Sequence, residues 1–271
     1  MEKEMKLAVL IDAENIASKY IGVILNEANA LGNVIYKRIY GNWTSTQMGA
    51  WRDTVLDNSI QPIQQYNNAS GKNSSDSSLI IDAMDLLYTG KLNCFCIVSS
   101  DSDFTRLATR LRESEVYVLG MGEQKTPRSF ISACNKFAYL DLLYHAASGA
   151  GTKKRQQSGA GKKSNGAEEK ASRQQASAKP PEKESGPNEP NGSDLEAIKA
   201  ALGDIAEQNA DNDGRIIASK LADLLGKSFP DFDARNFGYK TFLPFVVSLQ
   251  MFDMERDKTN PTVVYFKLKA S

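Results

Sequence analysis

The sequence has little of what disulfide-linked and zinc proteins need. Its 271 residues include three cysteines and a single histidine, His145. Three cysteines cannot all pair within one chain, and Cys94 and Cys96 alternate within an apolar run that is typical of a buried strand. We therefore interpret them as free thiols of a reducing compartment. One histidine also argues against a histidine-rich zinc site and against a histidine general base.

Long apolar runs are missing as well. No run approaches the roughly 20 residues that span a bilayer. The apolar stretch after the charged residues 1–6 is interrupted by Asp12, which is too early for a signal peptide. We expect a cytoplasmic protein with no membrane segment.

The chain also lacks an excess of charge, with 33 basic and 33 acidic residues. This balance disfavours tight, purely electrostatic binding to nucleic acid. Between residues 146 and 192 there is no Leu, Ile, Val, Met, Phe, Tyr or Trp, so this stretch is predicted to be a disordered linker. It divides the chain into domains at 1–145 and 193–271, each with a net charge of −2, joined by a linker of net charge +4.

Strand-like and helix-like segments alternate through the first domain. Repeated βα units of this kind predict a parallel sheet with helices on both faces, and ligands bind such sheets outside the carboxyl ends of the strands. The predicted strands are 7–11, 34–40, 60–65, 94–98 and 116–119, and the predicted helices are 21–28, 44–56, 79–88 and 104–111.

Several aspartates lie where those strands end. Asp12 ends the first strand, Asp101 and Asp103 follow the buried strand 94–98, and Asp76 precedes a helix. Asp76 and Asp103 could each be a helix N-cap, so the conjunction of all four is what matters. Carboxylates that meet at one rim repel each other unless a cation neutralises them, and oxygen ligands suit Mg²⁺ or Mn²⁺. Such ions can activate water against a phosphodiester.

Other acidic-site chemistries fit less well. Haloacid-dehalogenase-type phosphatases need Asp-x-Asp at the first strand, whereas Asp12 is followed by Ala13 and Glu14. A receiver domain would have its acidic pair at the first strand, and here the pair comes later. No GxxxxGK[ST] loop is present, and the isolated Gly120-x-Gly122 is weak evidence for a dinucleotide site.

The segments 10–16 and 98–104, with Lys72, Asp76 and Asp82 between them, resemble the NYN domain family. These are PIN-like, metal-dependent ribonucleases that include LabA-like bacterial proteins. The resemblance covers roughly residues 5–145, and segments 120–123 and 127–134 resemble a bacterial subgroup. It implies a PIN-like Rossmannoid parallel sheet flanked by helices.

The same resemblance implies roles for individual residues. The metal ligands and catalytic carboxylates would be Asp12, Asp76, Asp101 and Asp103, while helical geometry points Asp82 away from Asp76. Asn15 would orient Asp12 or contact phosphate, Lys72 would neutralise phosphate, and Ser100 would bind phosphate or metal-bound water. For Lys72 and Ser100, a solvated lysine and a loop cap remain the alternatives.

The second domain shows three helical stripes and a terminal strand at 263–268 after a polar turn, which suggests a winged helix-turn-helix. Segment 232–240 resembles the OST-HTH (LOTUS) domain, a family that binds RNA or, in some animal members, a helicase. Arg235, Tyr239 and Lys240 are its candidate RNA contacts, whereas its phenylalanines are interpreted as core. The stripes are Leu195, Ile198, Leu202 and Ile205; then Ile216, Ile217, Leu221, Leu224 and Leu225; then Phe242, Phe245, Val246 and Leu249.

The leading hypothesis is a Mg²⁺- or Mn²⁺-dependent endoribonuclease whose second domain targets RNA. A non-catalytic RNA-binding or protein-interaction adaptor that keeps the NYN fold, and a DNA nuclease with the same site, stay open. PIN-like domains often dimerise, so a homodimer is a further expectation, although no residue identifies its interface.

Overall fold

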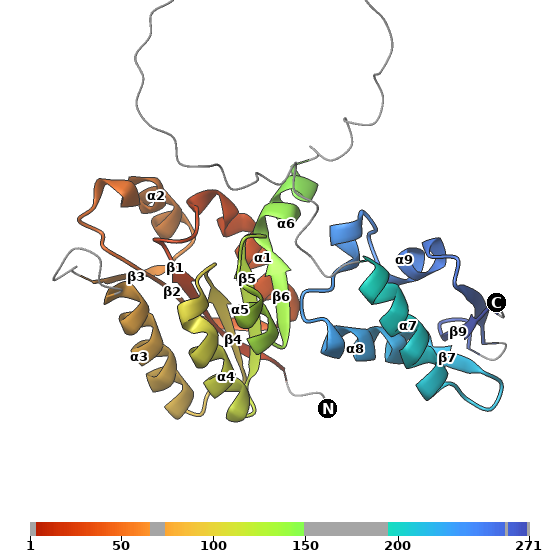
Figure 1. Ribbon diagram of the computed structural model, residues 1–271. Coiled ribbons are helices and arrows are strands. Elements are labelled where there is room, and N and C mark those ends of the chain that lie inside the picture. The colour runs from red at the N-terminus through yellow and green to blue at the C-terminus, as the bar shows by residue number, and fades with distance from the viewer. Residues whose placement is uncertain (1–3, 66–73, 149–194, 258–259, 270–271) are drawn as a thin grey trace, which may run out of the picture.

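The computed structural model describes residues 4–65, 74–148, 195–257 and 260–269, which form a large α/β part and a smaller C-terminal part beside it (Figure 1). Most of the predicted linker, together with Lys72, lies outside the described residues. No helix within the described ranges is long and apolar enough to cross a bilayer.

The large part is built on a six-stranded sheet whose neighbouring strands are all parallel. The strand order is β3-β2-β1-β4-β5-β6, so the chain leaves β1 in one direction for β2 and β3 and returns to its other side at β4. The junction of β1 and β4 is therefore the topological switch point. The strands are β1 Lys6–Asp12, β2 Asn33–Gly41, β3 Gln61–Gln64, β4 Cys94–Val98, β5 Tyr117–Gly122 and β6 Lys136–Tyr139.

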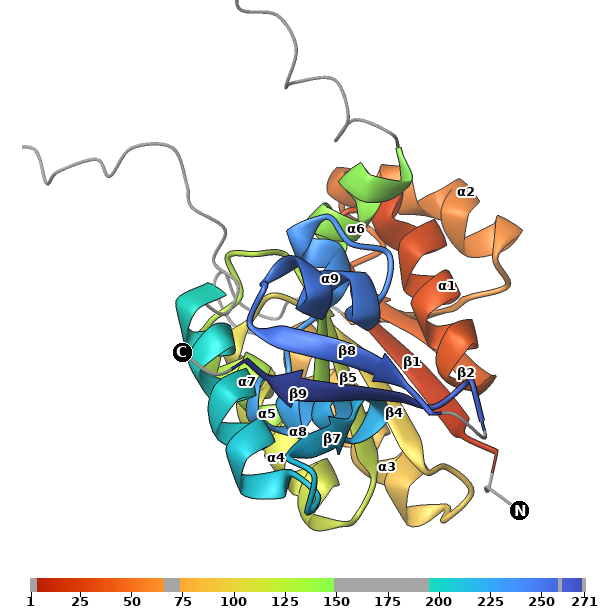
Figure 2. The ribbon, with the colours of Figure 1, turned by 90° about the vertical axis from the view of Figure 1, so that its right-hand side faces the viewer.

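Helices cover both faces of this sheet (Figure 2). Successive residues of β1 alternate between the two cores: Ala8 and Leu10 pack with α3, α4 and α5, while Val9 and Ile11 pack with α1, α2 and α6. This burial on both faces explains why the strands have continuous apolar runs. The helices are α1 Ile21–Leu31, α2 Gly49–Asp57, α3 Ser74–Tyr88, α4 Thr105–Glu113, α5 Arg128–Ala133 and α6 Leu140–Ala147.

The predicted parallel sheet is confirmed, with differences in detail. The helix expected over 44–56 begins only at Gly49, after a 3-10 turn at Thr46–Met48. The elements α5, β6 and α6 had not been predicted, because runs of only six, four and eight residues show little periodicity. The three cysteines are buried free thiols, as expected.

The C-terminal part combines helices with a three-stranded antiparallel sheet of order β7-β9-β8, which agrees with the predicted winged helix-turn-helix class. One helix prediction was wrong at its start, since Ile216 and Ile217 belong to β7 and pair with β9. The elements are α7 Leu195–Asn209, β7 Arg215–Ile217, α8 Ala218–Ser228, the 3-10 helix η5 Ala234–Phe237, α9 Phe242–Ser248, β8 Phe252–Arg256 and β9 Val264–Leu268.

Candidate metal centre

The carboxyl ends of β1 and β4 lie side by side at the switch point. Ile11 pairs with Val98, so the next residues, Asp12 and Ser99, emerge at the same edge of the sheet. The 3-10 helix η3 (Ser102–Phe104) and then α4 follow β4 directly. The first turn of α3 holds Asp76 at the same edge.

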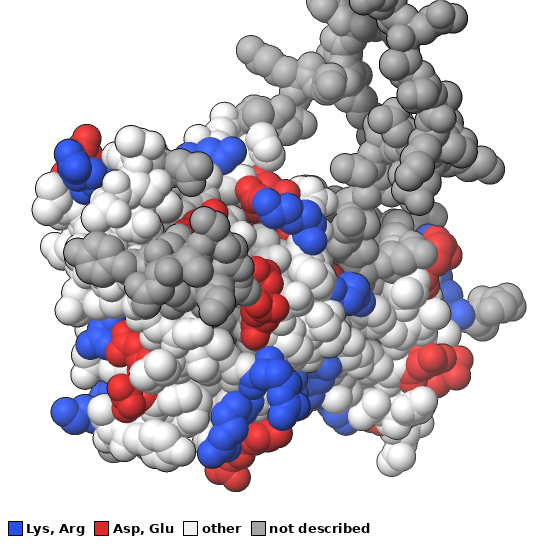
Figure 3. Space-filling model, turned by 60° about the vertical axis from the view of Figure 1, so that its left-hand side comes forward, with Lys and Arg blue, Asp and Glu red and all other residues white. Residues whose placement is uncertain are grey.

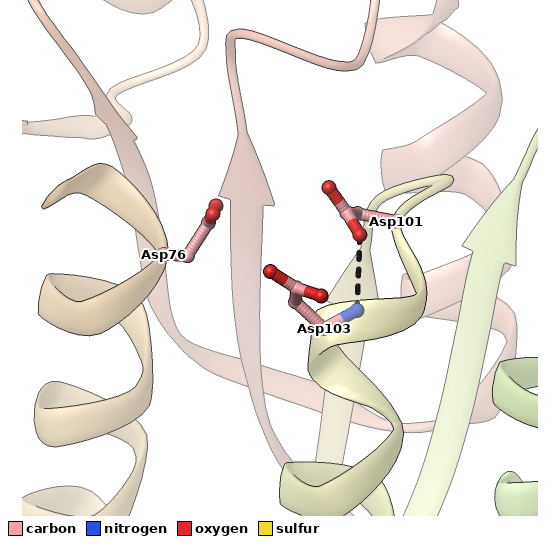
Figure 4. A group of neighbouring side chains, drawn as sticks. All are labelled: Asp76, Asp101 and Asp103. Carbon is pink, nitrogen blue, oxygen red and sulfur yellow. Dashed lines mark hydrogen bonds between the residues drawn. The ribbon is translucent and has the colours of Figure 1, made fainter. Parts of the chain in front are cut away.

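Three of the four predicted carboxylates come together here. One oxygen from each of Asp76, Asp101 and Asp103 lies within 4.8 Å of the others. Figure 4 shows Asp76 reaching from α3 across the end of β1 toward the other two. We call these three residues the acidic rim.

The electrostatics of the acidic rim follow from this crowding. Partial burial, and then the negative charges of Asp12, Asp101, Asp103 and Glu14, together raise the pKa of Asp76 to about 6. In the metal-free protein Asp76 therefore keeps its proton to a higher pH than an ordinary aspartate does. A divalent cation among these oxygens would act against that shift, because ligand carboxylates bind deprotonated.

The helix caps differ from the sequence-based alternatives. Asp101, rather than Asp103, is the N-cap of η3, and its Oδ1 accepts a hydrogen bond from the Asp103 backbone N–H at 3.0 Å. Asp76 lies inside the first turn of α3 rather than before it. At that position a negative charge interacts favourably with the helix dipole. Helix capping therefore explains the position of only one carboxylate oxygen of the acidic rim, Asp101 Oδ1. It does not explain why the three carboxylates lie so close together.

Asp12 lies deeper than the acidic rim and is only 1% exposed. Its Oδ1 accepts the backbone N–H groups of Glu14 and Asn15, and its Oδ2 accepts the Asn15 amide at 2.7 Å and the Ser99 hydroxyl at 2.8 Å. Burial raises the pKa of Asp12, and these four hydrogen bonds act to lower it. Through Ser99, Asp12 is linked to the loop that carries Asp101, and the Asn15 amide donates to Asp12.

Ser99 is a site residue that the sequence reasoning missed. It is completely buried, donates to Asp12, and accepts the Asp101 backbone N–H at 3.1 Å. Gly122 at the end of β5 packs against it, since a Cβ there would lie 2.6 Å from the Ser99 carbonyl oxygen. The Gly120-x-Gly122 pair is therefore explained by close packing, and the signal for Ser99 was its place directly after a buried strand.

The remaining predicted residues lie nearby with other partners. The Ser100 hydroxyl oxygen accepts a hydrogen bond from the Glu123 backbone N–H at 2.9 Å, which connects the loop that carries Asp101 to the loop after β5. Asp82 accepts hydrogen bonds from Arg38 and Tyr40 on β2 and is not part of the acidic rim. Lys72 lies outside the described residues.

The predicted RNA contacts of the C-terminal part differ in their surroundings. Lys240 is exposed, whereas Tyr239 is half-buried and packs edge-on against Phe245. Arg235 is engaged in ion pairs with Glu27 and Asp233. The phenylalanines Phe232, Phe237 and Phe242 pack against the hydrophobic core, as expected.

The residues of the acidic rim fit a hard divalent cation. All three offer carboxylate oxygens, the ligands that Mg²⁺ and Mn²⁺ prefer. His145 lies at the exposed end of α6. The first turn of α4 presents Arg106 and the last turn presents Arg110, both exposed. Figure 3 shows a basic area beside acidic side chains on one face of the molecule.

Carboxylates gathered at the switch point of a parallel sheet define a class of α/β proteins whose site lies at the strand ends. A model of the NYN domain matches residues 6–141, slightly more than half of the chain, and a model of the OST-HTH/LOTUS domain matches residues 193–264. The chain belongs to the NYN domain family and carries an OST-HTH/LOTUS domain at its C-terminal side, which confirms both resemblances.

Other comparisons add little. No curated protein matches the chain. Among solved structures, a crystal structure of a Vibrio parahaemolyticus protein of unknown function is 15% identical with a TM-score of 0.43. The match covers 51% of this chain and 93% of that one.

Proposed function

We propose that this protein is a Mg²⁺- or Mn²⁺-dependent endoribonuclease that hydrolyses RNA phosphodiester bonds at the acidic rim. The observation that carries the proposal is the convergence of Asp76, Asp101 and Asp103 at the switch point of an NYN fold. Partial burial, and then the negative charges of the neighbouring carboxylates, raise the pKa of Asp76. Carboxyl groups with such perturbed pKa values gather at functional sites, and converging carboxylate oxygens are typical ligands of Mg²⁺ and Mn²⁺.

The chain's own residues have separate tasks in this proposal. Asp76, Asp101 and Asp103 would hold the ion, and Asp12 would hold it or position the loop through Ser99. The bound ion would neutralise phosphate charge and activate a water molecule. Ser100, Asn15 and Lys72 are proposed substrate contacts, and we add Arg106 as a phosphate contact because it lies in the first turn of α4, which begins at the acidic rim.

The C-terminal domain is proposed to bring RNA to this site. The OST-HTH/LOTUS match supports an RNA partner, and Lys240 and Tyr239 are its proposed contacts. The division of the chain into domains at 1–145 and 193–271, joined by a linker at 146–192, is part of the same proposal. If the protein is a non-catalytic adaptor, the C-terminal domain is proposed to bind a protein partner. A tethered RNA-binding domain raises the local substrate concentration at the acidic rim.

One assay tests the activity. Purified protein is incubated with single-stranded RNA and with DNA of the same sequence, in Mg²⁺, in Mn²⁺ and with chelator. We expect RNA cleavage that requires metal and that Asp101→Asn slows by about 10³-fold, because losing a charged ligand removes transition-state stabilisation of about 4 kcal/mol.

The matched control is Asp85→Asn, an exposed aspartate on the same helix as Asp76, which should keep full activity. Absence of cleavage with every metal, or equal rates for Asp101→Asn and wild type, would sink the nuclease proposal. RNA binding without cleavage would instead support the non-catalytic adaptor. Preferential cleavage of DNA would change the substrate class and keep the site.

A further inference from the structure

The outer edge of β6 and the C-terminal domain meet at a contact made of several kinds of interaction. β6 is the last strand of the sheet, so its outer side has main-chain groups that no strand of this sheet pairs. The Phe137 backbone N–H donates to the carbonyl oxygen of Pro230 at 2.7 Å. Pro230 lies between α8 and η5 of the C-terminal domain. A segment of one domain thus covers the sheet edge of the other.

A buried carboxylate follows directly. Asp231 is 1% exposed, and its Oδ2 accepts hydrogen bonds from Arg128 and from the Tyr139 hydroxyl, both at 2.9 Å. Arg128 begins α5 and Tyr139 ends β6, so both donors belong to the NYN domain. Burying a carboxylate is costly unless it is paired. Asp231 has these two donors only when the domains are docked, so the pairing stabilises the docked arrangement.

A second anchor lies on α1. The guanidinium of Arg235 donates to both oxygens of Glu27, at 2.6 and 2.9 Å, and also to both oxygens of Asp233. Hydrogen bonds from Arg235 to Glu27 first, and to Asp233 next, raise the pKa of Arg235. Bidentate arginine–carboxylate pairs are the strong and geometrically specific ones. This arginine belongs to the segment that carries the OST-HTH resemblance.

We propose that the β6 edge, with Glu27, Arg128 and Tyr139, is a docking surface for the chain's own C-terminal domain, which stays seated there in solution. Segment 229–237 is the occupant, and Arg235 serves this interdomain joint rather than RNA. The main-chain bond, the buried carboxylate and the bidentate pair come from different elements of both domains. Their agreement defines one relative position of the two domains.

The joint also reaches the acidic rim through the chain. Arg128 follows the loop 123–127, and that loop is tied to Ser100 by the Glu123 backbone N–H. Ser100 immediately precedes Asp101. The docked domain therefore contacts Arg128, the residue directly after the loop that contacts Ser100. In this arrangement the C-terminal domain is a fixed neighbour of the site rather than a loosely tethered one.

The test uses the full chain and the variant Glu27→Lys, which places a second cation beside Arg235. Hydrogen exchange is measured for the amides of β6 and of segment 229–237, and X-ray scattering gives the particle's maximum dimension. We expect the wild type to scatter as one compact body. In the variant these amides should exchange about tenfold faster or more, and the maximum dimension should increase, because the joint opens.

The control Glu113→Lys makes the same charge change at the exposed end of α4 and should match the wild type. Unchanged protection in α3 and β4 shows that Glu27→Lys is folded. A wild-type profile of two separated bodies, or a Glu27→Lys variant with unaltered exchange, would overturn the proposal. Protection of β6 that falls on dilution would overturn the assignment to the same chain, since docking within one chain is independent of concentration.

Discussion

Buried or half-buried carboxylates occur in two regions of this molecule, the interdomain joint and the acidic rim, and the charges around them differ between the two. At the interdomain joint, Asp231, Asp233 and Glu27 are each paired with an arginine. At the acidic rim, Asp76 faces two further aspartates. Burial acts to raise the pKa of Asp233, but the hydrogen bonds from Arg235 outweigh it and lower the pKa. For Asp76, burial and neighbouring charge both raise the pKa.

The difference separates a structural use of charge from a functional one. A paired carboxylate stabilises the arrangement that pairs it, and breaking the pair leaves a buried charge or dipole without its partner. Carboxylates that converge on one another, as at the acidic rim, raise the free energy of the metal-free fold, and in our proposal they persist because a cation binds there. Neutral substitutions should therefore change stability in opposite directions in the two regions.

The largest effect is expected at the joint. Asp231→Ala removes the acceptor that Arg128 and Tyr139 share. We expect the free energy of unfolding to fall by about 3 kcal/mol, at the low end for a broken buried pair because the Arg128 side chain is 60% exposed. Urea denaturation of the full chain measures it. Asp204→Ala on the exposed face of α7 is the control and should change stability by less than about 0.5 kcal/mol; similar losses in both would mean that the joint adds no stability.

The next effect is steric and falls on the loop of the acidic rim. Gly122→Ala would bring a Cβ to 2.6 Å from both the Ser99 carbonyl oxygen and the Thr126 hydroxyl. We expect a loss of about 2 kcal/mol from overpacking, together with weaker Mn²⁺ binding, because Ser99 carries the Asp101 loop. Gly22→Ala in α1 has open space and should be neutral or slightly stabilising. Equal urea midpoints for the two variants would show that the loop adapts freely.

A smaller effect is expected from the Ser99 hydroxyl. Ser99→Ala removes its bond to Asp12 and its acceptance of the Asp101 N–H. Two buried hydrogen bonds lost should reduce stability by about 1.5 kcal/mol. Thermal unfolding compares it with Ser102→Ala, an exposed neighbour for which no clear change is expected. If Ser99→Ala matched Ser102→Ala, Asp12 would not depend on Ser99 for its position.

The sequence was sufficient for the parallel sheet and for the acidic rim, because apolar strands ending in aspartate are local signals. It could not reveal Ser99, whose role depends on the register of β1 beside β4. Nor could it reveal the ion pair that Arg235, predicted as an RNA contact, makes with Glu27. The partner of that arginine, Glu27, is more than two hundred residues away in the chain, and no local pattern connects them. Contacts between distant segments are set by packing, which local sequence patterns do not encode.

The smallest effect has the opposite sign and depends on pH. The pKa of Asp76 is raised from 3.8 to about 6 in the folded protein, so folding favours its protonated form. That stabilisation is complete below pH 3.8 and is lost as the pH rises through about 6. At pH 7, Asp76→Asn should therefore stabilise the metal-free protein, by on the order of 1 kcal/mol after allowing for solvent screening of a half-buried group. The gain should disappear toward pH 4, and Mg²⁺ should stabilise the wild type but not Asp76→Asn.

Chemical denaturation at pH 4 and pH 7, with and without Mg²⁺, measures the pH dependence and the metal effect. Asp85→Asn is the exposed control on the same helix. If Asp76→Asn were less stable than the wild type at pH 7 without metal, the comparison would be wrong. The Asp76 carboxylate would then stabilise the acidic rim, as the paired carboxylates stabilise the joint.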